Sequence, residues 1–575
     1  MRKIIFCLLI LSGIAIAPAH ATTYYVAKNG VITNTGTKDS PWPTIGFAAG
    51  RTGPGDAVHV AAGLYDERIS ITKPGGANAF INYVADGQVI CRGFDVVNVS
   101  YVRIIGFEIT HTSSSFNDGI VISGACFHVE ILDNYIHGVH ATHGGIVCLT
   151  GTMLSYPKIR GNRIEDVGIV NGLPVDVPSV GISTIPVATD HPLIEYNTLK
   201  RVGDFIYMHG TNCIARNNAL TQYTNDYWNI TFSAHIDGFQ DGSDGIAVGT
   251  RHHVYENNWE GESSSQDSHA GIWQDTVGAG DFDILIRGNV FYRVGAGGIA
   301  VYSADDFYTY NNTFSEDSYA VAASGNGNVF FARAFNSDVP DRGMIANTIF
   351  YDNGNRSGAI NIADATNYTS TRNLGFLAGT DASYAVITDP LFVDKSSKNF
   401  RLQASSPAIN AGAAVTTVTS ANGSGTSFNV GNGQLFCDGF GIVDGDTITV
   451  GGTTTQISLI SGNTIAVAAS VTWTNGAPVY WGNTARADIG ALPFGSKELT
   501  SASLEQQGTT YTVTPDGDTR GVWFYVDGIP TTWDATPPYT TTVASGVVTA
   551  KAYALYAQAK PVVIADPRPS NLRAQ

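Results

Sequence analysis

Apolar and polar residues alternate in short stretches along most of the chain, and many of these stretches end in asparagine. The stretch from Val129 to Ile136 is one example, and seven more of the same kind follow it. The asparagines are Asn134, Asn162, Asn197, Asn218, Asn258, Asn289, Asn312 and Asn347, at steps of 28, 35, 21, 40, 31, 23 and 35 residues. Alternation with a period of two predicts β-strands. Steps of this size predict one solenoid turn each, with connecting loops of variable length.

A second apolar strand, opened by Gly or Asp, lies between successive Asn motifs. Examples are residues 118–122, 145–148, 204–208, 298–302 and 358–362. Strand, turn, strand, turn at this period predicts a parallel β-helix, because stacked coils bury a core that no coil can bury alone. We expect each motif Asn to hydrogen-bond the same position on the next coil and therefore to be structural.

The first hundred residues continue this picture. Residues 55–69 predict a strand and a turn, and residues 102–109 predict the first clear rung of the solenoid. Residues 44–51 predict a short helix, which would cap the end of the solenoid and hide its core from water.

Three segments carry a resemblance to a known superfamily. They are the opening stretch from Tyr24 to Gly30, the stretch from Gly63 to Arg68, and the closing stretch from Asp389 to Gly412. Together with the Asn rungs they resemble the pectin-lyase-like superfamily of right-handed parallel β-helix proteins. The resemblance covers residues 23–410, about two thirds of the chain. It implies the fold, but the superfamily contains lyases, hydrolases, epimerases and plain binders, so it does not select a reaction.

The remaining sequence divides the chain into five parts. We expect a signal peptide at 1–21, the β-helix at 22–414, a small all-β insert at 415–482, a closing segment at 483–497, and an immunoglobulin-like β-sandwich with a tail at 498–575. In proteins of this kind, the closing stretch from Asp389 to Gly412 usually runs directly into a stretch like that of Ala487 to Ala491. Here the insert separates the two stretches. The insert and the sandwich are each equally compatible with carbohydrate binding and with a spacer role.

The N-terminus and the charge restrict where the protein works. Arg2 and Lys3 precede the apolar run from Ile4 to Ile16, and Ala19 to Ala21 form a small-residue cleavage site. This pattern predicts a Sec signal peptide and a secreted, periplasmic or cell-surface protein, because the run is too short for a membrane anchor. Loss of Arg2 and Lys3 changes the net charge from −17 to −19. Such a charge argues against nucleic acid and anionic membranes as partners, and more weakly against a polyanionic glycan, unless a local basic patch or bound cations screen the charge.

The cysteines predict no disulfide framework. Five remain after the signal peptide, at irregular spacing, and an odd number cannot pair completely. They are Cys91, Cys126, Cys148, Cys213 and Cys437. We expect them to be buried thiols in the core, and one disulfide remains an alternative in an oxidising compartment.

Two neighbouring coils carry nearly the same polar string, residues 235–241 and residues 269–275, offset by 34. In a stacked solenoid this offset predicts His on His, Gln on Gln and Asp on Asp, with an outward-facing Asp237 above Asp204 of the previous coil. The expected catalytic residues are Asp204, Asp237, Asp241, Asp275, His235 and His269. The expected substrate-binding residues are Gln240, Gln274, Tyr207, Trp273, Lys200 and Arg201. Carboxyl groups cleave glycosidic bonds, and aromatic rings stack on sugars.

The spacing of these acids favours a glycoside hydrolase that uses stacked carboxylates. Adjacent coils lie about 4.8 Å apart, so Asp204 and Asp237 would suit a retaining mechanism at about 5 Å. Asp237 and Asp275, on a diagonal, would suit an inverting one. Crowded carboxylates should also raise one pKa and create an acid.

Alternatives to a hydrolase stay open. A polysaccharide lyase would use Lys200 and Arg201 to neutralise a uronate and His235 as the base. A glycan-binding adhesin would bind a glycan without cleaving it. In a further alternative, the candidate residues are only an exposed polar ladder that has no function. No metal site or cofactor is expected, although Asp241 to Gly245 is a weak candidate for Ca²⁺ that lacks the length of a known loop. We expect a polysaccharide partner and a monomer.

Overall fold

The structure is a computed structural model that describes most of the chain. The described residues are 21–111, 118–139, 141, 143–149, 153–170, 173–174, 179–184, 188–222, 237–244, 251–262, 270–277, 282–295, 297–301, 306–316, 329–331, 341–352, 360–362, 366–378, 381–484, 486–560 and 562–565. Among them, no helix is long and apolar enough to cross a membrane.

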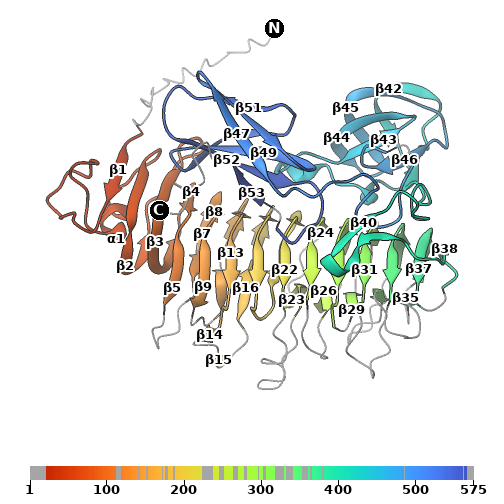
Figure 1. The fold of residues 1–575 in the computed structure, drawn as a ribbon, viewed down its shortest axis with the longest axis horizontal. Helices are drawn as coiled ribbons and strands as arrows, with labels where there is room; N and C mark the ends of the chain where they lie inside the picture. The colour runs from red at the N-terminus through yellow and green to blue at the C-terminus, as the bar shows by residue number, and fades with distance from the viewer. Residues whose placement is uncertain are drawn as a thin grey trace, which may run out of the picture.

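The main body is a right-handed parallel β-helix (Figure 1). Each coil contributes one strand to each of three parallel sheets, which we call sheets A, B and C, rather than the two strands expected from the sequence. Sheet A contains β4 (Val102–Ile105), β8 (Val129–Leu132), β12 (Lys158–Arg160), β18 (Leu193–Glu195), β21 (Cys213–Arg216), β24 (Arg251–Glu256), β27 (Phe282–Arg287), β30 (Asp306–Tyr310), β33 (Asp341–Ala346) and β36 (Thr366–Thr371).

Sheets B and C complete the coils. Sheet B contains β5 (Glu108–His111), β9 (Tyr135–Val139), β13 (Arg163–Glu165), β19 (Thr198–Lys200), β22 (Ala219–Thr221), β25 (Trp259–Gly261), β28 (Val290–Tyr292), β31 (Thr313–Ser315), β34 (Ile349–Tyr351), β37 (Asn373–Phe376) and β38 (Tyr384–Val386). Sheet C contains β6 (Ile120–Ser123), β10 (Gly144–Cys148), β16 (Val180–Ser183), β20 (Ile206–Met208), β23 (Phe239–Asp244), β26 (Ala270–Val277), β29 (Gly297–Val301), β32 (Val329–Phe331) and β35 (Ile360–Ile362).

The N-terminal coils use longer strands. They are β1 (Thr23–Val26), β2 (Ala57–Ile71) and β3 (Ile81–Val97), and β3 pairs with the first strands of all three sheets. The expected short helix is α1 (Ile45–Ala49), in which the Thr44 hydroxyl accepts a hydrogen bond from the N–H of Phe47. Outside the three sheets lie the short strands β7 (Ala125–Phe127), β11 (Met153–Ser155), β17 (Ala188–Asp190), β14 (Ile169–Val170) and β15 (Leu173–Pro174).

A ladder of asparagine side chains lies at the bend between sheets A and B, as predicted. The Oδ1 of Asn162 accepts hydrogen bonds from the backbone N–H and the Nδ2 of Asn134, at 3.0 and 3.1 Å. The Nδ2 of Asn162 donates to the carbonyl of Ile131 at 2.9 Å. The same contacts repeat coil by coil to Asn312. A residue with positive φ precedes most rungs, such as Asp133 at 60°. This left-handed residue breaks each coil between sheets A and B, because Asn, Asp and Gly tolerate such a backbone.

The prediction of the last rung, Asn347, is wrong by one residue. Asn347 takes the left-handed position, with φ of 51°, and its side chain bonds to the backbone of Ala413. The rung itself is Thr348, whose N–H donates to the Oδ1 of Asn373 at 3.0 Å. Threonine replaces asparagine here, so the repeated letter that located the other rungs is missing.

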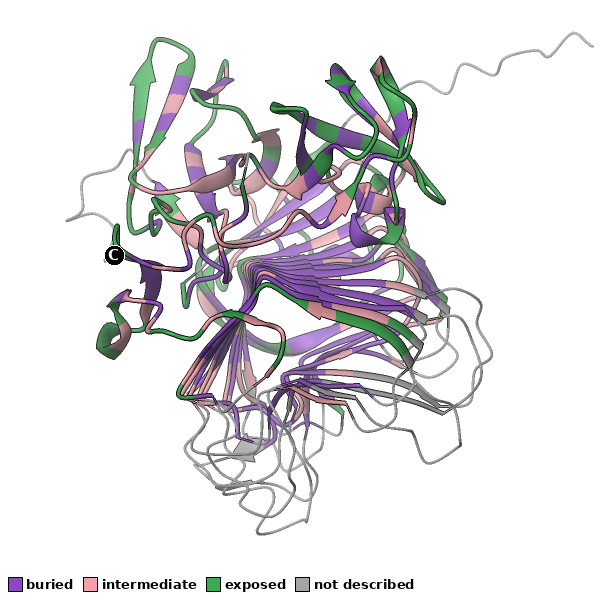
Figure 2. Ribbon diagram, turned by 90° about the vertical axis from the view of Figure 1, so that its right-hand side faces the viewer, coloured by how far each residue is buried: buried purple, intermediate pink, exposed green. Residues whose placement is uncertain are grey.

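The core runs through the inside of the solenoid (Figure 2). Its inward rows are mostly Ile, Val and Phe, and 5 % or less of each of the five cysteines is exposed. The structure therefore confirms the expectation of buried thiols and pairs none of these five residues.

The C-terminal part covers sheet A (Figure 1). After the hairpin of β39 (Phe392–Asp394) and β40 (Asn399–Leu402), a six-stranded sheet forms what we call the small domain. Its strands are β41 (Thr416–Thr417), β42 (Gly423–Asn429), β43 (Thr447–Val450), β44 (Thr453–Ser461), β45 (Thr464–Trp473) and β46 (Pro478–Trp481). Two further antiparallel sheets form what we call the sandwich domain. They are β47 (Ala502–Gln507), β48 (Thr510–Pro515) and β51 (Tyr539–Thr542), and β49 (Thr519–Val526), β50 (Ile529–Asp534), β52 (Val548–Ala554) and β53 (Val562–Ala565).

Candidate functional site

The register of sheet C tests how the two polar strings stack. Gln240 lies opposite Trp273, Asp241 opposite Gln274, and Gly242 opposite Asp275. The coil step is therefore 33 residues, not 34, and the expected stacking of Gln on Gln and Asp on Asp is wrong. The physical reason is the core: Phe239 and Ile272 pair with one another and are both fully buried, and this apolar pair sets the register.

The expected alignment of Asp204 with Asp237 is present, but Asp237 does not face outward. Tyr207 pairs with Gln240 at an offset of 33, so Asp204 lies at the position equivalent to Asp237. Asp237 is fully buried. The Oδ1 of Asp204 accepts a hydrogen bond from the backbone N–H of Asp237 at 2.9 Å. Asp204 thus supports the chain at the turn into β23, where the bend brings Asp237 inward.

The other described candidates lie apart from one another. Tyr207 and Gln240 are half-buried and adjacent on sheet C. Lys200 ends β19 on sheet B, and Arg201 follows it. The guanidinium of Arg201 donates to both carboxylate oxygens of Asp166, at 2.6 and 2.7 Å, and to Gln222 at 3.0 Å. Arg201 is therefore already used in a contact between coils.

Several predicted residues lie outside the described residues. His235 and His269 are among them, and so are the side chains of Asp241, Trp273, Gln274 and Asp275, whose backbone the structure does describe. Gly245, at the end of the weak Ca²⁺ candidate, is also outside. Within the described part of the chain, no group of three or more His, Cys, Asp or Glu is arranged to hold a metal ion.

A cavity of about 670 Å³ lies between sheet A and the two C-terminal domains. Its floor is formed by side chains from successive strands of sheet A. Its other walls include Trp481, Trp523, Trp533 and Tyr556. The sequence patterns did not predict this site, because its floor comes from residues 158–311 and its other walls come from residues 437–556.

A row of alternating charges crosses the floor of this cavity. It has one member per strand, in direct register from β12 to β27. We call it the charge ladder, and its members are Arg160, Glu195, Arg216, Glu256 and Arg287. Each is more than nine-tenths buried. Glu195 accepts from Arg160 at 2.6 Å and from Arg216 at 2.8 Å.

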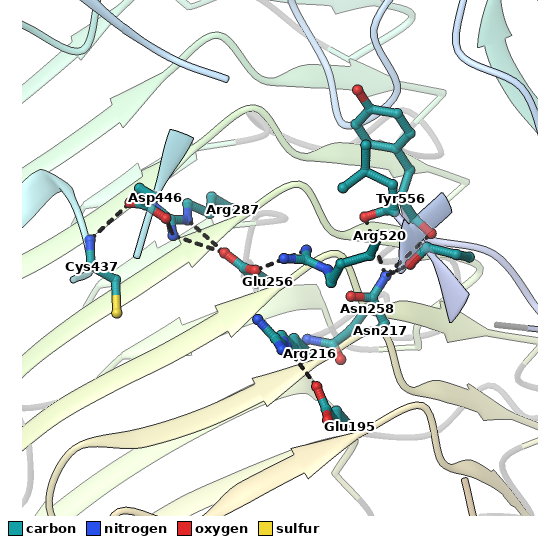
Figure 3. A network of polar contacts seen from close by, with 12 residues as sticks. Glu195, Arg216, Asn217, Glu256, Asn258, Arg287, Cys437, Asp446, Arg520 and Tyr556 are labelled. Atoms are coloured by element: carbon teal, nitrogen blue, oxygen red, sulfur yellow. Dashed lines mark hydrogen bonds and ion pairs between the residues drawn. The ribbon is translucent and has the colours of Figure 1, made fainter. Parts of the chain in front are cut away.

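The C-terminal domains complete the charge ladder (Figure 3). Arg287 donates to Glu256 at 2.8 Å and to Asp446 of the small domain at 2.6 Å. Arg520 of the sandwich domain donates to Glu256 at 3.1 Å. The ladder therefore joins three parts of the molecule through buried ion pairs.

The ladder carboxylates remain ionised at any ordinary pH. Burial opposes their ionisation, but Arg160 and Arg216 outweigh it and hold the pKa of Glu195 at about 2. Arg287 and Arg520 likewise hold the pKa of Glu256 at about 2. A carboxylate with such a pKa has no proton to give near neutral pH, so neither residue suits the role of a general acid.

The described lining of the cavity has five basic and five acidic side chains, and two of the basic ones have N–H groups that the charge ladder does not use. Arg216 uses its Nε for Glu195, and the structure gives its other N–H groups no described partner. Lys158, two residues before Arg160 in β12, contacts Glu130 at 3.4 Å. Burial lowers the pKa of Lys158, and the charge of Arg160 lowers it further. Burial raises the pKa of Tyr556 to about 12, so its phenol stays protonated.

No family model matches the chain. An uncharacterized protein of Bacillus subtilis (strain 168), YwoF, is 31% identical over 137 residues, and the match covers 20% of this chain and 29% of that relative. The chain thus spans less than a third of that curated relative.

The chain is also similar to solved structures. Pectate lyase Pel9A is 16% identical with a TM-score of 0.41, over 68% of this chain and 92% of its own. The GH136 lacto-N-biosidase from Eubacterium ramulus is 11% identical with a TM-score of 0.40, over 62% and 68%. The PL6 family alginate lyase AlyGC is 14% identical with a TM-score of 0.37, over 62% and 54%. The parallel pairing of the three sheets is that of a parallel β-helix, the fold that the sequence predicted.

Proposed function

We propose that this protein is a polysaccharide-cleaving enzyme, and that it cleaves a uronate-containing glycan by β-elimination in the cavity between sheet A and the C-terminal domains. The observation that supports this proposal most is Arg216. Its side chain is buried on a rigid sheet, and only its Nε has a partner among the described residues. The signal peptide expected at 1–21 would take the enzyme to where such polymers occur.

Arg216 fits the recognition of a carboxylate. A guanidinium presents five N–H donors in a planar fork that matches a carboxylate with two parallel hydrogen bonds. Glu195 occupies the Nε side of that fork and holds it in place. The Nη side is left for a uronate, and the rings of Trp523 and Trp533 in the same cavity offer apolar faces for sugar rings.

Elimination also requires a base and an acid, and the cavity contains a candidate for each. Lys158 is the candidate base, because its lowered pKa increases the fraction of neutral amine that can take the C5 proton. The electron pair of the C5–H bond forms the C4–C5 double bond as the bond from C4 to the leaving oxygen breaks. The phenol of Tyr556 is protonated and is the candidate donor to that oxygen.

A hydrolase is the second candidate, and it would act on a different face. The sequence favours it, and Asp204 and Asp237 do occupy neighbouring coils of sheet C. In the cavity, Glu195 and Glu256 are ionised and therefore do not suit the role of its general acid. On sheet C the burial of Asp237 argues against direct contact with a polymer.

A cleavage assay separates these possibilities. The full chain is offered polygalacturonate, alginate and a neutral glucan, and both new reducing ends and the ultraviolet absorbance of unsaturated uronate are followed. We expect both signals on a uronate polymer. Arg216→Ala should lower kcat/KM by on the order of 100-fold or more, the size of effect seen when one buried donor to a developing charge is removed. Arg216→Lys should recover part of the loss.

The control is Arg92→Ala, which removes an exposed pair with Asp66 far along the chain from the cavity. It should leave the rate unchanged. New reducing ends without the ultraviolet absorbance of unsaturated uronate would contradict elimination. Asp204 and Asp237 would then be the candidate catalytic residues. Elimination activity that is unchanged in the Arg216→Ala variant would show that the cavity is not the site of the reaction.

A further inference from the structure

A second hollow lies between the same strands of sheet A and the small domain. It is a groove of about 480 Å³ whose β-helix wall includes Asn212, His252, Asp283 and Tyr308. Val254 lines both this groove and the larger cavity, and His252 and Glu256 lie two residues on either side of it in β24. The apolar contact of Val254 with the small domain separates the two sites.

A histidine–aspartate pair occupies the β-helix side of this groove. The Nδ1 of His252 lies 2.5 Å from the Oδ2 of Asp283. Asp283 is nine-tenths buried, and its other carboxylate oxygen has no partner within the described chain. The side chain of His252 is 38% exposed. Because Asp283 fixes the Nδ1 edge of the ring, the Nε2 edge is left for a ligand.

An aromatic ring stands on the opposite wall. Phe440 of the small domain has φ of 51°, a left-handed conformation that is unfavourable for an aromatic residue. Asp438 holds it there, because its Oδ1 accepts from the N–H of Phe440 and its Oδ2 accepts from the N–H of Ile460. The half-buried ring of Phe440 lies 5.9 Å from the ring of His252, tilted by 32°.

The charge of the groove differs from that of the cavity. Its described lining contains Asp283 and Asp438 and no Lys or Arg, so it disfavours an anionic sugar. The amides of Asn212, Gln434 and Asn463 also line it. Amides and a histidine bind sugar hydroxyls, and an aromatic ring packs on the apolar face of a pyranose. We propose that this groove binds a neutral saccharide unit, independently of the elimination proposed for the cavity.

The test is direct binding to the full chain by isothermal titration calorimetry, with cellohexaose and mannohexaose as neutral probes and hexagalacturonate as the anionic one. We expect a neutral hexamer to bind, and Phe440→Ala and His252→Ala each to weaken its affinity at least tenfold. Phe440→Tyr, which keeps the ring, should restore binding. Leu459→Ala is the matched control, because Leu459 is exposed on β44 of the same domain and does not line the groove.

Three results would overturn the proposal. They are the absence of binding by both neutral hexamers, neutral binding that Phe440→Ala and His252→Ala leave intact, and preferred binding of hexagalacturonate at this groove. The Arg216→Ala variant keeps the two proposals apart, because it should lose cleavage and still bind the neutral hexamer. A chain that binds the hexamer and cleaves nothing would therefore contradict only the proposed function.

Discussion

The asparagine ladder and the charge ladder run side by side along the same solenoid. A rung of one lies two residues from a rung of the other, as Asn162 follows Arg160. An amide is both a donor and an acceptor, so one residue type can bond to itself in every coil. A guanidinium only donates and a carboxylate only accepts, so the charge ladder has to alternate.

The two ladders therefore differ in what they contribute. The asparagine ladder is neutral and satisfies backbone groups at the bend between sheets A and B. The charge ladder is buried only because the C-terminal domains cover it, and it extends into them through Asp446 and Arg520. The first ladder builds the β-helix, and the second binds the domains to it.

The largest effect should come from removing one charge of the charge ladder. Glu195→Ala leaves Arg160 and Arg216 buried without their carboxylate, which should lower the free energy of unfolding by about 3–5 kcal/mol. Chemical denaturation followed by circular dichroism measures it. Asp66→Ala, which breaks an exposed pair with Arg92, should cause no measurable change. A loss below about 1 kcal/mol for Glu195→Ala would mean that water already reaches the two guanidinium groups.

Acid should weaken the charge ladder and leave the asparagine ladder intact. The pKa of Glu195 and of Glu256 is about 2 in the folded protein, against an ordinary value of 4.5. Their contribution is therefore complete above about pH 4.5 and is lost as the pH falls towards 2, by about 3 kcal/mol for each group. Denaturation curves recorded at several values between about pH 6 and about pH 2.5 measure this loss. A Glu195→Ala variant with an equally steep acid dependence would contradict the assignment.

A smaller loss should follow from breaking the asparagine ladder. Asn258→Ala removes the acceptor of the Asn218 N–H and of its side chain, together with the donor to the carbonyl of Ala215. Buried polar groups left without partners cost about 1–3 kcal/mol, and this loss should not depend on acid. The same denaturation curves measure it. Asn258→Asp is the informative partner variant, because it keeps the acceptor and removes the donor.

The smallest effect on stability should come from replacing a whole section of the charge ladder. The triple change Arg160→Leu, Glu195→Leu and Arg216→Leu removes all three charges together, so no charge is left alone. Apolar substitution of a buried triad is often neutral or stabilising, and we expect a change within about 1 kcal/mol. The same variant should lose elimination activity with Arg216. A loss as large as that of Glu195→Ala alone would show that the charges stabilise the fold in themselves.

The contrast between the ladders also explains what the sequence could reveal. The asparagine ladder repeats one letter, so the solenoid, its coils and most rungs were predictable. The prediction of a rung was wrong only where Thr348 replaces Asn. The charged positions are equally periodic, two residues before each motif Asn from Asn162 to Asn289, but their letters alternate between Arg and Glu. An alternation of sign at a fixed offset is the signal that could have located them.

The rest of the site depends on contacts that no local pattern contains. The register of Asp241 and Asp275 depends on which apolar residue of each coil enters the core, and the pairing of Phe239 with Ile272 decides it. The cavity depends on how the domains dock, because Trp481 and Trp523 reach sheet A from distant parts of the chain. The sequence therefore predicts the β-helix and not the cavity above it.

The small domain leaves and rejoins the chain at almost the same point. The N–H of Gly412 donates to the carbonyl of Ala487 at 2.9 Å, and the N–H of Asn410 donates to the carboxylate of Asp488 at 2.7 Å. A gene can therefore gain, lose or exchange this domain as a cassette without shifting a single coil of the solenoid. Because the cassette supplies walls to both hollows, lineages that exchange it would change what the protein recognises while inheriting the same scaffold.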